Sequence, residues 1–139
     1  MKRILILCNG NSARSQMAQE FLKRITFNRV EVLSAGINAK PIHPMAVRVM
    51  QELGIDVSEN ESKSVNKFYH ERFDYVITVC DEAREKCPDF QGSFTKIHKS
   101  IEDPTLAKGT EQEKMEAFRN VRDNIKEWLT DFAERYKLG

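Results

Sequence analysis

The sequence predicts an α/β fold built on a four-stranded parallel sheet. Four short apolar runs alternate along the chain with stretches whose apolar residues recur at helical spacing. This alternation is typical of parallel sheets whose strands are joined by crossover helices. We therefore expect a Rossmann-like three-layer arrangement, with helices on both faces of the sheet. The length of 139 residues suits one hydrophobic core, so residues 1–139 are expected to form a single domain.

The expected strands are the apolar runs at residues 3–7, 30–35, 75–79 and 94–97. A first helix is expected to begin near Arg14, and a second to span residues 44–53 and stop at Gly54. A third helix is expected over residues 111–136. Their apolar faces predict the following core residues: Met17, Ala18, Phe21, Leu22, Ile25, Ala46, Val49, Met50, Leu53, Met115, Phe118, Val121, Ile125, Trp128, Leu129 and Phe132.

Composition argues against several partners. Charged residues make up 31% of the chain and the formal net charge is +1, which gives no basic footprint for nucleic acid. No apolar run approaches the ~20 residues that a membrane span needs, and the short run after Met1 does not suit a signal peptide. We expect a monomeric cytoplasmic protein. Three cysteines in a reducing compartment are not expected to form structural disulfides.

The eight residues after the first expected strand, Cys-Asn-Gly-Asn-Ser-Ala-Arg-Ser at positions 8–15, indicate an oxyanion site. Gly10 and Asn11 tolerate the positive φ angles that turn backbone N–H groups inward. With the next helix N-terminus, these groups form an anion nest. The expected oxyanion-binding residues are Asn9, Gly10, Asn11, Ser12, Ala13 and Arg14.

The same loop carries a candidate nucleophile. The positive field of the nest favours the thiolate of Cys8, which is the nucleophilic form. Arg14 can bind two oxygens with its planar fork, and Ser15 can donate a hydrogen bond to the thiolate. The alternative is that Cys8 is a small buried residue that ends a strand, as many free cysteines do.

Cys80 follows another expected strand, so the parallel topology can bring it near Cys8. Cys80 and Cys87 are separated by six polar, helix-favouring residues. A helix of seven residues rises ~10.5 Å, whereas a disulfide needs Cα atoms within about 7 Å. A Cys80–Cys87 bridge would therefore require this segment to loop out. Alternatively, both are inert buried thiols.

A metal site is not expected. The cysteine spacing matches no common zinc pattern. The three histidines, His43, His70 and His98, are not at metal-ligand spacing and are expected to be surface or loop residues.

Asp103 is the candidate acid. It precedes Pro104, which favours extended geometry in a loop after the last expected strand. Its carboxyl could protonate a leaving oxygen over the loop at residues 8–15. The side chain of Glu102 should then point away from that of Asp103.

Together these residues resemble the thioredoxin-coupled arsenate reductases, which are built on the low-molecular-weight tyrosine phosphatase fold. The resemblance covers essentially the whole chain and is carried by residues 8–15, Ser34-Ala35-Gly36, Cys80 with Cys87-Pro88, and Asp103-Pro104. The phosphatase-type loop and the Asp-Pro pair are shared by reductases and phosphatases. The Cys80 and Cys87 arrangement is specific to the reductase branch.

The resemblance implies a thiol relay for arsenic detoxification. Cys8 attacks arsenate, Asp103 protonates the departing oxygen, and Cys80 then attacks Cys8 with release of arsenite. Cys87 attacks Cys80, and external thioredoxin reduces the resulting Cys80–Cys87 disulfide. No bound cofactor is implied. Phosphate and sulfate should compete with arsenate because all three fit one nest.

Some members of this group bind potassium through residues that match Asn11 and Ser34. An acidic ligand of that site is replaced here by Lys63, so we expect no potassium site, with the Lys63 ammonium in its place.

Two other functions fit the sequence. The first is a low-molecular-weight phosphatase that acts on phosphotyrosine or another phosphoester with Cys8, Arg14 and Asp103. The second is a non-catalytic oxyanion-binding or redox-sensing module. Weak phosphatase activity is expected even of a reductase.

Overall fold

The computed structural model describes residues 1–138 and contains the expected four-stranded parallel sheet. The strands are β1 (Arg3–Cys8), β2 (Glu31–Gly36), β3 (Tyr75–Thr78) and β4 (Thr95–His98), in the order β2-β1-β3-β4. Each observed boundary lies within one residue of the expected one, which confirms the predicted strands and the fold class. The strand β1 is buried from Ile4 to Cys8, because both faces of the sheet are covered.

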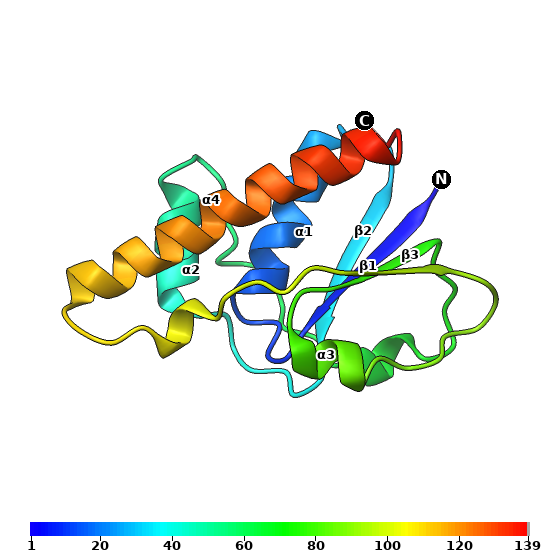
Figure 1. The fold of residues 1–139 in the computed structure, drawn as a ribbon, viewed down its shortest axis with the longest axis horizontal. Coiled ribbons are helices and arrows are strands. Elements are labelled where there is room, and N and C mark those ends of the chain that lie inside the picture. Colours follow the sequence, from blue (N-terminus) through cyan, green and yellow to red (C-terminus); the bar gives the residue numbers. More distant parts are fainter. Residues whose placement is uncertain (139) are drawn as a thin grey trace.

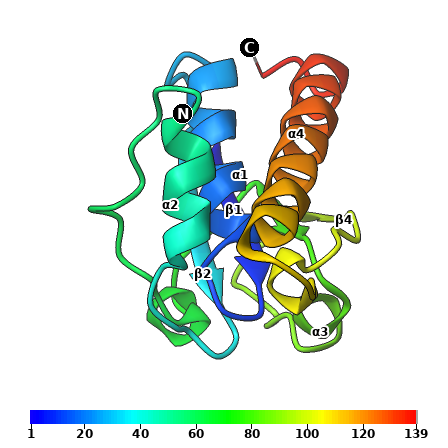
Figure 2. The same cartoon turned by 90° about the vertical axis from the view of Figure 1, so that its left-hand side faces the viewer.

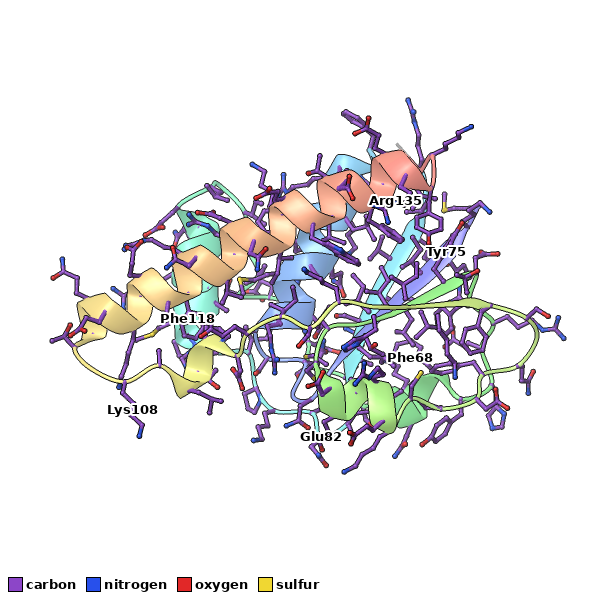
Figure 3. The ribbon with its side chains drawn as sticks, in the orientation of Figure 1. Phe68, Tyr75, Glu82, Lys108, Phe118 and Arg135 are labelled. Atoms are coloured by element: carbon purple, nitrogen blue, oxygen red, sulfur yellow. The ribbon has the colours of Figure 1, made fainter. Side chains whose placement is uncertain are left out.

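Within residues 1–138, four α-helices and two short 3₁₀ helices surround the sheet: α1 (Arg14–Ile25), α2 (Pro44–Gln51), η1 (Val65–Phe68), α3 (Asp81–Glu85), η2 (Pro104–Leu106) and α4 (Glu111–Arg135). The long helix α4 packs across α1 and α2 (Figures 1 and 2). Tyr75 on β3 lies under the C-terminal end of α4, where its ring meets those of Phe132 and Tyr136 (Figure 3). One continuous hydrophobic core joins the sheet to these helices.

Capping residues set the helix starts. The side chain of His43 accepts a hydrogen bond from the N–H of Met45 at the start of α2, and Pro44 occupies the first turn. Thr110 and Glu113 form a capping box at the start of α4. The prediction that Leu53 is buried is wrong, because α2 ends at Gln51 and Leu53 lies in the following turn, 42% exposed.

The carboxyl ends of the strands gather at one edge of the sheet, away from the two chain termini (Figure 1). β1 pairs with β2 on one side and with β3 on the other. The strand order therefore reverses at β1, with β2 on one side of it and β3 and β4 on the other. Ligands of open α/β sheets bind at such a switch point, beyond the carboxyl ends of the strands. Cys8 is the last residue of β1 and therefore lies at this position.

The turn between α1 and β2 is strained. Phe27 and Asn28 adopt positive φ angles of 52° and 57°, and the ring of Phe27 is 74% exposed. The left-handed region costs most residues about 1 kcal/mol, whereas asparagine visits it more readily. We expect Phe27→Asn to raise the free energy of unfolding by about 0.5–1 kcal/mol and the melting temperature by a few degrees. The control is Phe27→Leu, which keeps the strain; a melting temperature of Phe27→Asn no higher than that of Phe27→Leu would contradict this explanation.

Candidate active site

The peptide groups of the loop after β1 are oriented by a facing segment, residues 37–43. Four loop carbonyl oxygens accept hydrogen bonds of 2.8–3.1 Å from this segment: Cys8 from Ile37, Asn9 from Asn38, Gly10 from Lys40, and Ser12 from His43. The C=O and N–H groups of a trans peptide point in opposite directions. The N–H groups that follow these carbonyls are therefore turned away from the segment. Among residues 1–138, those of Gly10 and Ala13 donate to no other group, which leaves them for an anion.

The loop bends at Asn11, which has a φ of 49°. The expectation that Gly10 also adopts a positive φ is wrong, because the single left-handed residue already reverses the chain. The structure gives the physical reason for Gly36, the last residue of the Ser34-Ala35-Gly36 motif. A Cβ atom at Gly36 would lie 2.8 Å from backbone atoms of Asn9, Gly10 and Asn11, so only glycine lets β2 end against the loop.

A cavity of about 270 Å³ opens over Cys8. Its lining brings together seven of the expected site residues, Cys8, Asn9, Gly10, Ser12, Ala13, Arg14 and Asp103. The other two loop residues, Asn11 and Ser15, are fully buried and lie outside the lining. Four lining residues were not predicted, Lys40, Pro41, His43 and Thr105. His43 lies in a loop, as expected, and the structure adds that it lines this cavity. Segment 37–43 is held against the Cys8 loop by tertiary contacts that no sequence motif indicates.

Two hydrogen-bond donors converge on the Cys8 sulfur. The backbone N–H of Asn11 lies 3.1 Å from it, and the Ser15 hydroxyl lies 2.8 Å from it. The Asn11 Oδ1 atom accepts the backbone N–H of Lys63 at 2.9 Å, so the Asn11 Nδ2 group must face the other way, toward Ser15. Ser15 Oγ accepts from Nδ2 at 2.7 Å, which leaves the hydroxyl proton for the Cys8 sulfur. This directed chain suits a thiolate.

The Asn11 amide is itself held by buried neighbours. Its Nδ2 group also donates to Ser34 Oγ at 2.9 Å, and the Ser34 hydroxyl donates to Gln19 Oε1 at 2.6 Å. Gln16 donates to Asn11 Oδ1 at 3.0 Å. These side chains are all at least nine-tenths buried, so the network fixes the bend of the loop from behind.

Arg14 and Asp103 face each other across the cavity. Arg14 Nη1 donates to the Ile101 carbonyl oxygen at 3.0 Å, and Nη2 lies 3.6 Å from Asp103 Oδ2. Asp103 Oδ1 is occupied by the N–H and hydroxyl groups of Thr105, at 3.0 and 2.7 Å. The other carboxyl oxygen, Oδ2, faces Arg14 and is the one placed to exchange a proton with an oxyanion bound there. Glu102 is exposed and is absent from the lining, as expected.

Cys80 lies beside the Cys8 loop. β1 and β3 pair Leu7 with Thr78, and the N–H of Val79 donates to the Leu7 carbonyl oxygen at 2.9 Å. The Cys80 sulfur caps α3 by accepting the N–H of Ala83 at 3.4 Å. Burial raises the pKa of the Cys80 thiol, while the N–H of Ala83 and the positive charge of Arg14 oppose this shift.

Cys87 lies in a different place from the other two cysteines. The helix-favouring residues between Cys80 and Cys87 form α3, which covers Asp81–Glu85 and leaves Cys87 just beyond its end. Cys87 lines a separate groove of about 250 Å³. Burial raises the pKa of its thiol, and the positive charge of nearby Lys96 opposes this shift only in part. All three cysteines are free thiols.

Lys63 packs against the back of the loop. Its ammonium donates to the Glu61 carbonyl oxygen at 3.0 Å, and burial lowers its pKa.

Residues 1–138 contain no group of three histidine, cysteine or acidic side chains that could hold a metal ion. No helix within the same residues is long and apolar enough to cross a membrane.

Comparison with known proteins shows the family of the chain that carries this cysteine loop, arginine and aspartate. A sequence model described as low molecular weight phosphotyrosine protein phosphatase matches residues 3–138. The chain belongs to this family. Within it, curated relatives named arsenate reductase are 43% identical in Bacillus licheniformis, over 96% of both chains. The relatives in Halalkalibacterium halodurans and Bacillus subtilis are 40% and 41% identical, over 98% of both chains.

Solved structures of the family agree with this assignment. A structure described as an arsenate reductase in the phosphate binding state superimposes with a TM-score of 0.82 at 30% identity, covering 97% of this chain and 98% of that chain. A structure described as an arsenate reductase in oxidized state gives the same TM-score at 29% identity and covers both chains fully. The arginine phosphatase YwlE, at 23% identity and a TM-score of 0.74, shares the fold.

Proposed function

We propose that the protein is an arsenate reductase that works by a thioredoxin-coupled cysteine relay. The observation that carries this proposal is the position of Cys80 at the end of β3, beside the Cys8 loop, with Cys87 just beyond α3. A phosphatase needs one cysteine, whereas a relay needs a second thiol next to the first and a third within reach of the second. Relatives that are 40–43% identical and are named arsenate reductase support the substrate.

The first step forms a sulfur–arsenic bond. The Cys8 thiolate attacks arsenate, whose oxygens are held by the loop N–H groups and by the Arg14 guanidinium. An arsenate hydroxyl group accepts the proton of the Asp103 carboxyl and leaves as water, and Cys8 carries the arsenic. Ser15 and the N–H of Asn11 hold the sulfur in position for this attack.

The second step is the reduction. The Cys80 thiolate attacks the Cys8 sulfur, a disulfide forms, and the electron pair of the breaking sulfur–arsenic bond reduces As(V) to As(III), which leaves as arsenite. The Cys87 thiolate then attacks the Cys80 sulfur and releases Cys8 as a thiolate. Bonding at the Cys80 sulfur removes the acceptor that caps α3, so this five-residue helix loses its N-terminal support and opens for Cys87. Thioredoxin reduces the Cys80–Cys87 disulfide.

The test is arsenate-dependent oxidation of NADPH in the presence of thioredoxin and thioredoxin reductase. We expect steady turnover with arsenate and none with phosphate. After one arsenate turnover without thioredoxin, mass spectrometry should show a loss of two hydrogens that maps to Cys80 and Cys87. If NADPH is not consumed in the presence of arsenate, the proposal is wrong.

Hydrolysis of phosphomonoesters is the second candidate. The 270 Å³ cavity is larger than a bare tetrahedral oxyanion requires, and Asp103 is placed to protonate an ester oxygen as well as an arsenate oxygen. The cavity lining contains no phenylalanine, tyrosine or tryptophan that could stack on a phosphotyrosine ring. We therefore propose phosphatase activity as a weak side reaction, measurable with p-nitrophenyl phosphate.

Potassium is not expected to support the site. The Lys63 N–H and Gln16 Nε2 donate to Asn11 Oδ1, and the Lys63 ammonium donates to the Glu61 carbonyl oxygen, so these oxygens are already engaged by donors of the chain. We expect activity and melting temperature to be the same in potassium chloride and in sodium chloride of equal ionic strength. A rise in either quantity that is specific to potassium would show that the ion binds here.

A further inference from the structure

Lys40 and His43 form a second wall of the Cys8 cavity that the reaction scheme leaves unused. Both residues line the cavity and lie on the segment that holds the loop. The Lys40 N–H donates to the Gly10 carbonyl oxygen at 2.8 Å, and the His43 N–H donates to that of Ser12 at 2.9 Å. The backbone of both residues is therefore fixed relative to the anion nest.

His43 is a fixed hydrogen-bond donor. Its Nδ1 atom accepts the N–H of Met45 at 3.1 Å, so the proton of the neutral ring must be on Nε2. The ring lies against Phe118, with the centroids 4.9 Å apart, which limits its rotation. Within residues 1–138, Nε2 has no hydrogen-bond partner, so the remaining polar atom of a ring that lines the cavity is an unused donor.

Lys40 adds a positive charge that nothing else neutralises. Its side chain is exposed and forms no ion pair with a carboxylate of residues 1–138. The charge of Arg14, by contrast, is partly countered by Asp103, and one of its N–H groups is used by Ile101. An anion in the cavity would therefore meet, in addition to Arg14, the unpaired charge of Lys40, whose exposed side chain costs little to desolvate.

We propose that Lys40 and His43 are additional binding residues for a tetrahedral oxyanion, and that they take the oxygens that face away from the Cys8 loop. The loop N–H groups and Arg14 bind the anion from below, while Lys40 and His43 Nε2–H bind it from the open side. The ligand class is a doubly charged tetrahedral oxyanion such as phosphate or arsenate. The role in arsenate reduction rests on the function proposed above, whereas the binding role does not.

The test measures binding of inorganic phosphate to the reduced protein by isothermal titration calorimetry. We expect the dissociation constant to rise about fivefold or more in Lys40→Met, with a smaller rise as ionic strength increases. His43→Asn keeps an oxygen that can cap α2 and removes the Nε2–H group, because the asparagine amide is shorter than the ring. It should raise the constant by about threefold to tenfold. Lys108→Met is the matched control, because the Lys108 side chain extends from the molecule on the loop before α4 (Figure 3).

A kinetic readout separates binding from structural support. KM for arsenate should rise in both variants while kcat stays near the wild-type value, and the melting temperature of Lys40→Met should not change. A dissociation constant for phosphate that is unchanged in both variants overturns the proposal. Because inorganic phosphate is the probe, this result does not depend on arsenate turnover, and failure of the reductase function would appear separately in the NADPH assay.

Discussion

Replacing Cys80 with serine is expected to abolish arsenate turnover and to leave the hydrolysis of p-nitrophenyl phosphate almost unchanged. Cys80 caps α3 and lies beside the loop, but it is not part of the cavity lining that binds the anion. A serine hydroxyl can still cap the helix, so the fold and the nest are preserved. It cannot form a disulfide, so arsenate turnover should fall by roughly 10³-fold or more, as it does when a covalent nucleophile is lost.

The two other cysteines give distinct expected results in the same assays. Cys8→Ser should lose both activities, because each begins with attack by this sulfur. Cys87→Ser should complete the first two steps once and stop, leaving a Cys8–Cys80 disulfide that mass spectrometry can map. If Cys80→Ser and Cys87→Ser both keep full arsenate turnover, the relay is wrong and the phosphatase function takes its place.

The fold could be predicted because its signals are local. Each strand is an apolar run, and each long helix carries one apolar stripe, so composition and periodicity locate them to within a residue or two. The error occurs where a helix ends. Leu53 continues the apolar spacing of α2 but lies after the last helical residue. Helix ends depend on capping and tertiary contacts that periodicity does not record.

The candidate site could be predicted only in part. The loop at residues 8–15 is contiguous, so its spacing is visible in the sequence. Lys40 and His43 reach the same cavity because β2 ends against the loop at Gly36, where a side chain would collide with the backbone. This contact between distant segments has no sequence signature. The direction of the Ser15 proton also follows only from the backbone N–H of Lys63, which orients Asn11 from a third segment.

Arg14→Lys is expected to lower kcat/KM by about 10²–10³-fold, both for arsenate reduction and for hydrolysis of p-nitrophenyl phosphate. Arg14 uses one N–H group on the Ile101 carbonyl oxygen and turns another toward Asp103, so its plane is fixed across the cavity. A guanidinium held in this way can bind two oxygens of the anion with its remaining donors. A lysine ammonium keeps the charge but has one nitrogen, which cannot hold Ile101 and the anion together.

The parallel loss of both activities distinguishes Arg14 from Cys80. Reduction and hydrolysis share the step in which the anion is held and attacked, and they diverge only when the second thiol acts. A variant that damages the shared step must therefore reduce both rates by similar factors, whereas Cys80→Ser reduces one. Arg24→Lys, on the exposed last turn of the same helix, is the matched control and should leave both rates unchanged. A loss of less than tenfold in Arg14→Lys, or a loss confined to one activity, would mean that the guanidinium does not hold the reacting anion.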